Sequence, residues 1–116
     1  MARMTEEHVY KLLTADDWAT ASALGVTATE IDEADGYVHL STRAQAAETA
    51  RLHFAGRGPV RLLRFAVADL PELTWEPSRG GQLFPHLYAP LEVSLAEAAW
   101  HLMPDAAGVP RMPEEY

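Results

Sequence analysis

Short apolar stretches bounded by turn-forming residues recur along the chain and predict a framework of β-strands. The predicted strands are residues 8–13, 37–41, 60–68 and 83–88. The third is the most regular, because it is long, is apolar apart from its arginines and has turn residues on both sides. Pro85 lies inside the fourth, and since proline donates no backbone hydrogen bond we expect an edge or bulged strand there.

The stretches between and after these strands are less regular. Residues 26–31 predict a weak extended segment, and residues 73–81 predict a loop with a little extended structure. Residues 92–102 are compatible with a strand or a short helix, since their first half favours β-structure and their alanines favour a helix. Of the two, we favour a strand that bends.

Capping residues and helical spacing predict two short helices. Thr14 precedes two aspartates that suit a helix N-terminus, and the pattern runs to Leu24 and ends at Gly25. Thr42 opens the second helix, with Gln45 three residues later as a capping box requires. The apolar stripe of this second helix consists of Ala47, Ala50 and Phe54.

These elements predict an α+β fold, in which two short helices pack on a small, mostly antiparallel sheet. A chain of 116 residues suits one domain. We expect its core to span residues 8–103, followed by an irregular, proline-bearing and acidic tail at residues 104–116.

The amino-acid composition excludes several kinds of site. The chain has no cysteine, which excludes a disulfide framework, a thiolate zinc site and a cysteine nucleophile. No signal peptide and no apolar stretch of membrane-spanning length is present, so a cytoplasmic location without membrane contact is the expectation.

The net charge of −8 argues against binding to a long nucleic acid or an anionic membrane. Eight of the nine basic residues are arginine, the side chain that best clamps a phosphate or carboxylate. Six of them lie in the middle of the chain, namely Arg43, Arg51, Arg57, Arg61, Arg64 and Arg79. The pattern indicates either a solvated surface or a site for a small anionic molecule.

The first candidate segment is residues 37–42. Alternation along a strand directs Tyr37, His39 and Ser41 to one face, a row of hydrogen-bonding groups. Thr42 then opens a helix whose free amides can receive an anion. His39 is thus placed to hold a ribose hydroxyl or a phosphate; the alternative is a core histidine bonded to a backbone carbonyl.

The second candidate segment is residues 75–81. Gly80 and Gly81 free the backbone to aim amides at an anion, and Arg79 adds a bidentate clamp. Glu76 is a candidate acid, base or charge-stabilising carboxylate, and its neighbour Trp75 would raise its pKa by desolvation. A surface hairpin is the alternative.

The strand that follows carries Phe84, His86 and Tyr88 on one face, a wall on which an aromatic ring can stack. A metal site made by His86, His39 and Glu76 is an open alternative, but no local spacing supports it and we expect no metal. His53, at the end of a predicted helix, is interpreted as structural because a cation complements the helix dipole there.

These motifs resemble a small bacterial family, domain of unknown function 952, over residues 9–93. The matching residues are 35–42 (Asp-Gly-Tyr-Val-His-Leu-Ser-Thr), Gln45, Thr49-Ala50, His53-Phe54, Gly56, Trp75-Glu76, 78–81 (Ser-Arg-Gly-Gly) and 84–88 (Phe-Pro-His-Leu-Tyr). A more distant similarity of residues 37–42, the helix after them and the strand at 60–67 is to the RNA 2′-phosphotransferases of the ADP-ribosyltransferase superfamily.

That second similarity implies a split sheet and an NAD cleft. It places His39 on a strand lining the cleft, with Ser41 and Thr42 beside the ribose or phosphates. We therefore expect an enzyme that binds NAD, ADP-ribose or a related nucleotide and reacts at the ribosyl C1′. The expected catalytic residues are His39, Glu76 and His86, and the expected ligand-binding residues are Tyr37, Ser41, Thr42, Arg79, Gly80, Gly81, Phe84 and Tyr88. The alternative is a non-catalytic binding module for a small anionic metabolite.

Overall fold

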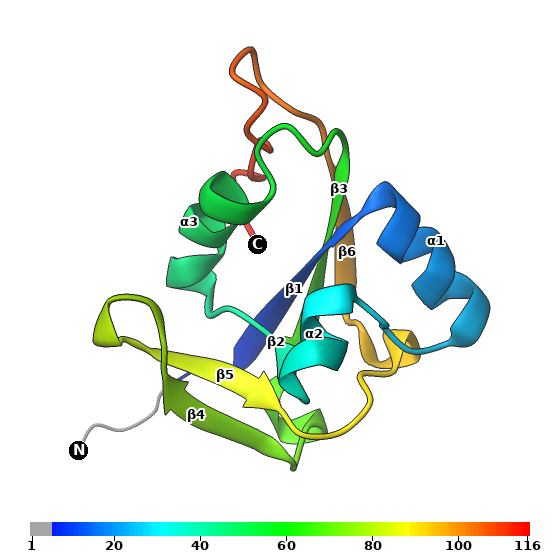
Figure 1. Cartoon of the computed structure of the whole chain (residues 1–116), viewed down its shortest axis with the longest axis vertical. Helices are drawn as coiled ribbons and strands as arrows, with labels where there is room; N and C mark the ends of the chain where they lie inside the picture. The colour runs from blue at the N-terminus through cyan, green and yellow to red at the C-terminus, as the bar shows by residue number, and fades with distance from the viewer. Residues whose placement is uncertain (1–5) are drawn as a thin grey trace.

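Two three-stranded antiparallel sheets form the framework of the computed structural model, which describes residues 6–116 (Figure 1). The first sheet has the order β1-β3-β6 and consists of His8–Thr14, Val60–Ala66 and Ala98–Leu102. The second has the order β2-β5-β4 and consists of Val38–His39, Leu83–Leu87 and Leu73–Pro77. The predicted α+β class is confirmed.

The helices are α1 (Ala15–Leu24), α2 (Glu30–Asp35) and α3 (Arg43–His53), and short 3-10 turns lie at η1 (Val67–Asp69), η2 (Arg79–Gly81) and η3 (Val93–Leu95). Both predicted caps are confirmed. The Thr14 side chain accepts a hydrogen bond from the amide of Asp17, and Thr42 and Gln45 form the complete capping box of α3. Because these caps satisfy otherwise unpaired amides, each stabilises its helix by about 1 kcal/mol.

Helix α2 corrects the end of the extended stretch expected at residues 26–31, because Val26 forms a β-bridge with Glu92 but the helix begins at Glu30. Thr29 caps this helix by accepting from the amide of Asp32, and Gly36 ends it in the left-handed conformation at φ 84°. Six residues are too few to show a helical period in the sequence, and the Asp35-Gly36 pair predicts a turn just as well as a helix end.

Strand β5 also differs from expectation, because it is the central strand of its sheet rather than an edge. Pro85 is tolerated there because β2 is only two residues long. The carbonyl of Pro85 accepts a hydrogen bond from the amide of Leu40. In an antiparallel pair the nitrogen of Pro85 points to the same side, toward Leu40, which lies just after the end of β2. The absent N–H of Pro85 therefore costs β2 no hydrogen bond. The expected loop at residues 73–81 contains the strand β4, which pairs with β5 along its whole length.

The favoured strand within residues 92–102 is present, but in the alanine-rich half. Residues Ala98–Leu102 pair with β3 as β6, while the half with β-forming residues contains η3. Pairing with a buried neighbour therefore outweighs the helical preference of alanine.

The first sheet is covered on both faces, as predicted for the strand at residues 60–68. Leu62 and Leu63 are adjacent in β3 and both are fully buried, although their side chains point to opposite faces. One face packs against α1 and the second sheet, in a cluster that includes Val9, Leu13, Phe65, Val38 and Leu87. The other face packs against α3, and Met112 and Tyr116 of the irregular tail also lie against it.

Within residues 6–116, an isolated β-bridge joins β1 of the first sheet to the segment that follows β2 of the second. The amide and carbonyl of Tyr10 exchange hydrogen bonds with Ser41 at 2.8 and 2.9 Å. This bridge holds the segment after β2 against the free edge of β1, and the candidate site lies along that edge. Within residues 6–116, no helix combines the length and apolar character needed to cross a membrane.

Candidate functional site

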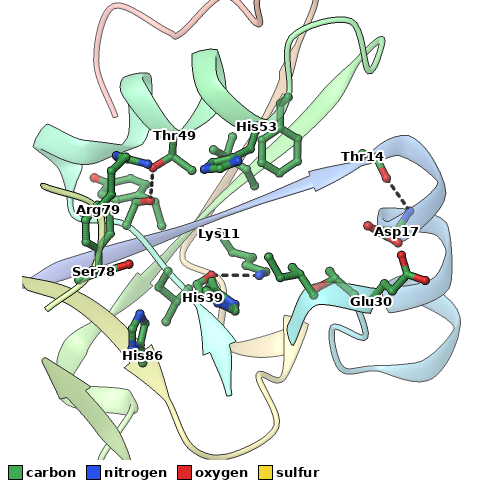
Figure 2. A pocket seen from close by; sticks show the side chains of 18 of the residues that line it. Lys11, Thr14, Asp17, Glu30, His39, Thr49, His53, Ser78, Arg79 and His86 are labelled. Atoms are coloured by element: carbon green, nitrogen blue, oxygen red, sulfur yellow. Dashed lines mark hydrogen bonds between the residues drawn. The ribbon is translucent and has the colours of Figure 1, made fainter. Parts of the chain in front are cut away.

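A cavity of about 370 Å³ lies along β1, between α2, α3 and the second sheet (Figure 2). Its volume is within the range of small-molecule sites, roughly 300–1,000 Å³. The predicted site residues that line it are His39, Ser41, Arg79, Phe84 and His86. The two segments singled out in the sequence therefore meet at one cavity.

Pairing of β2 with β5 explains this convergence. His39 and His86 are directly opposite one another in the register, and their ring centroids lie 5.6 Å apart. Tyr37, on the same face of its segment, stacks on His86 at 4.1 Å and lies 4.6 Å from the ring of His39. The aromatic row predicted from alternation is thus built around the two histidines.

The buried ion pair of Lys11 and Asp32 holds His39 in place. Asp32 Oδ1 accepts from the backbone amide of His39 at 3.1 Å and lies 2.6 Å from its Nδ1. Lys11 Nζ donates to Asp32 Oδ2 at 2.7 Å and to the carbonyl of His39 at 3.0 Å. One carboxylate and one ammonium therefore hold both the backbone and the ring of His39.

Burial and hydrogen bonding oppose each other at these two groups. Burial alone would raise the pKa of Asp32, but hydrogen bonds from His39 and the charge of Lys11 outweigh it and lower that pKa to about 2. Burial lowers the pKa of Lys11, and the nearby Asp32 partly offsets that effect. Asp32 is thus a permanent carboxylate at neutral pH.

The second ring nitrogen of His39 also meets a carboxylate. Its Nε2 lies 2.9 Å from Asp35 Oδ2, at the last residue of α2. A carboxylate can only accept a hydrogen bond, so both nitrogens of the His39 ring lie against groups that favour an N–H on the ring.

Within the part of the chain that the structure describes, His86 has one carboxylate partner. Its Nδ1 lies 2.7 Å from Glu76 Oε1, and the Tyr88 hydroxyl donates to the same oxygen at 2.8 Å. These hydrogen bonds lower the pKa of Glu76, and Glu76 in turn raises the pKa of Tyr88. The expectation that Trp75 raises the pKa of Glu76 is therefore wrong, because the hydrogen bonds outweigh desolvation.

Basic groups gather at the α3 end of the cavity. The guanidinium of Arg79 lies 4.8 Å above the ring of Phe84 and donates to Thr49 Oγ1 at 3.4 Å. His53 and Arg57 line the same end, so His53 is placed at the cavity as well as at a helix end. None of these three basic side chains forms an ion pair within residues 6–116.

Other predicted site residues lie outside the cavity lining, namely Glu76, Tyr37, Tyr88, Thr42, Gly80 and Gly81. The amide of Thr42 is bonded to the side chain of its capping partner, and the amide of Gly81 to the carbonyl of Ser78. These amides are therefore already satisfied. Within the described residues, His39, His86 and Glu76 do not form a group that could hold a metal ion.

Sequence reasoning missed Lys11 and Asp32, and it noted Asp35, Thr49 and Arg57 without assigning them to the site. One signal was present for Lys11, since a charged residue in an otherwise apolar strand is almost never buried without a partner. The partner comes from α2, whose existence the sequence pattern did not predict.

The fold and site define a small α+β domain with a histidine-lined cavity between two antiparallel sheets. The chain belongs to the family described as "Protein of unknown function (DUF952)", whose model matches residues 12–99. The crystal structure of protein CC0527 from Caulobacter crescentus is similar at 43% identity and a TM-score of 0.84, over 90% of this chain and 93% of that one. The solution structure of CC0527 is similar at 43% identity and a TM-score of 0.78, over 90% and 91%. No curated protein matches the chain.

Proposed function

We propose that the cavity binds a small phosphate-bearing ligand of the nucleotide class, such as NAD or ADP-ribose, and that the chain acts at the ribosyl C1′. The observation that carries the proposal is the set of basic side chains at one end of the cavity. Arg79 comes from η2, whereas His53 and Arg57 come from the end of α3 and the turn after it, and none of the three has an acid partner within residues 6–116. A phosphate is the charge-complementary ligand, and an arginine can clamp it with two parallel hydrogen bonds.

The neighbouring groups suit the rest of such a ligand. The hydroxyls of Ser41 and Thr49 lie 3.0 Å apart beside Arg79 and can donate to or accept from a ribose. Phe84 offers a ring face already covered by the guanidinium, so it holds Arg79 rather than a base. With a volume of about 370 Å³, near the lower end for ligand sites, the cavity suits the ribose phosphate part of such a ligand, with the rest of the ligand outside it.

The His86–Glu76 pair supplies the chemistry in this proposal. Glu76 fixes Nδ1 of His86, which leaves Nε2 as the nitrogen that can take a proton from water or another acceptor. The acceptor oxygen then bonds to C1′ while the bond from C1′ to the nicotinamide or base nitrogen breaks, and the leaving group keeps the electron pair. Glu76 is a positioning residue here, since it touches His86 and does not line the cavity.

The similarity of residues 37–42 to the RNA 2′-phosphotransferases supports the same ligand class. In that resemblance His39 would lie on a strand beside the NAD ribose, and His39 here is on β2 and lines the cavity. The arrangement of two three-stranded sheets is compatible with the split sheet that the ADP-ribosyltransferase superfamily implies.

One observation favours a non-catalytic binding module as the second candidate. The carboxylates that line the cavity, Asp17 and Glu30, lie at the end away from Arg79 (Figure 2). Stabilising a positive charge at C1′ requires a carboxylate close to the ribose, and neither is near the basic end. A module would bind the same small anionic molecule without turnover.

The test measures binding of ADP-ribose and NAD by the rise in melting temperature, together with release of nicotinamide from NAD. We expect both ligands to stabilise the protein, and Arg79→Ala to weaken binding by at least tenfold, because a charge-assisted hydrogen bond contributes about 1.5–3 kcal/mol. Arg111→Ala, which removes an arginine outside the cavity lining, is the matched control. Nicotinamide release that His86→Ala abolishes supports the enzyme; binding without release supports the module. No stabilisation by either ligand at millimolar concentration contradicts both.

A further inference from the structure

His39 has two carboxylate partners of very different character. Asp32, on the Nδ1 side, is buried, with only 6% of its side chain exposed, and Lys11 holds its other oxygen. Asp35, on the Nε2 side, has 43% of its side chain exposed. Within residues 6–116 the Asp35 carboxylate has no other hydrogen bond or ion pair. One partner is therefore fixed and the other is free to leave.

Local structure does not explain an acid at position 35. Asp35 is the last residue of α2, and the carbonyl end of a helix dipole disfavours a negative charge. The helix has no basic residue in its last turn that would compensate. Its acids Glu30, Asp32 and Glu33 lie in the first turn, where the dipole favours them. The favourable contact of the Asp35 carboxylate is the one with His39.

We propose that His39 Nε2 is an oxyanion subsite of the ligand cavity, and that the carboxylate of Asp35 occupies it until an anionic group of the ligand replaces it. The inference rests on the proposed function, since it uses the same ligand class. His39 lines the cavity whereas Asp35 does not, so the Asp35 carboxylate reaches the histidine from outside the cavity lining.

The chemistry of the ring determines what can replace Asp35. Because Nε2 lies 2.9 Å from a carboxylate oxygen, the group best suited to replace that carboxylate is another charged oxygen, since charge-assisted hydrogen bonds are about twice as strong as neutral ones. The subsite therefore takes a phosphate or carboxylate oxygen rather than a ribose hydroxyl. Because Asp32 stays bound to Nδ1 throughout, the ring keeps its position while its outer partner changes.

Replacing Asp35 removes a competitor for the subsite and a negative charge beside the incoming anion. We expect Asp35→Ala and Asp35→Asn to bind ADP-ribose about two- to fivefold more tightly than the wild type, the range of an exposed ion pair. Glu33→Gln is the matched control, because it removes one exposed negative charge from the same helix without touching His39. It should change affinity less than either variant of Asp35.

The experiment measures ADP-ribose and adenosine binding to the full chain and these three variants by calorimetry. Tighter binding of ADP-ribose alone by both Asp35 variants supports the subsite. If adenosine gains equally, or if the Asp35 variants match Glu33→Gln while the wild type binds ADP-ribose, the subsite is refuted and the proposed function stands. If none of the four proteins binds ADP-ribose at millimolar concentration, both the subsite and the proposed function fail. Inorganic phosphate, added as a third probe, shows whether the phosphate alone makes the contact.

Discussion

The Lys11–Asp32 pair should couple stability to the position of His39. Removing one member leaves the other as a buried charge without its partner, because both side chains are at most 6% exposed. Breaking a buried pair in this way costs about 3–5 kcal/mol of unfolding free energy. We therefore expect Lys11→Met and Asp32→Asn each to destabilise the protein strongly.

The double variant is the informative one. With both charges removed together no buried charge is left uncompensated, so the double variant should lose less stability than the two single losses summed. Urea unfolding at neutral pH measures the three free energies. Additive losses would show that the two side chains act independently and would refute the assignment of the pair as one unit.

The same pair predicts how stability falls in acid. The pKa of Asp32 is lowered from 3.8 to about 2 in the folded protein. A lowered carboxyl pKa adds stability that is complete above pH 3.8 and is lost as the pH falls through 2, which amounts to about 2 kcal/mol. The Asp32→Asn variant should lack this part of the acid dependence, and an unchanged acid profile would contradict the reasoning.

Three further predictions concern the framework of the site. Thr42→Ala removes the α3 cap and should lower the unfolding free energy by about 1 kcal/mol, as measured in urea; a loss below 0.3 kcal/mol would show that the capping box adds little. Leu62→Ala opens a fully buried position in β3 and should cost about 2–5 kcal/mol by the same assay, unlike the exposed Leu24→Ala. Tyr88→Phe removes a hydrogen bond that lowers the pKa of Glu76, so an NMR titration should show that pKa rising, and no rise would rule out the contact in solution.

The local parts of the fold follow from the sequence because their signals are local. The caps at Thr14 and Thr42 depend on residues within one helical turn, and the strand at residues 60–68 has apolar residues for both faces. Alternation also placed His39 and His86 on the sides of their strands that line the cavity, since it depends only on strand geometry.

The features that the sequence did not predict depend on contacts between segments that are distant in the chain. Strand β4 is extended because β5 lies beside it, and Pro85 is central only because β2 ends early. The contacts of Asp32 and Asp35 with the two ring nitrogens of His39 depend on helix α2, which the sequence pattern did not predict. Local sequence contains no information about which ring nitrogen meets which carboxylate.

An NMR titration of the full chain with ADP-ribose tests the central claim most directly. The account predicts saturable shifts at Thr49, His39 and His86, which line the cavity, and little change at Trp100 on β6, which does not. Shifts absent at millimolar ADP-ribose, or confined to residues outside the cavity lining, would contradict it.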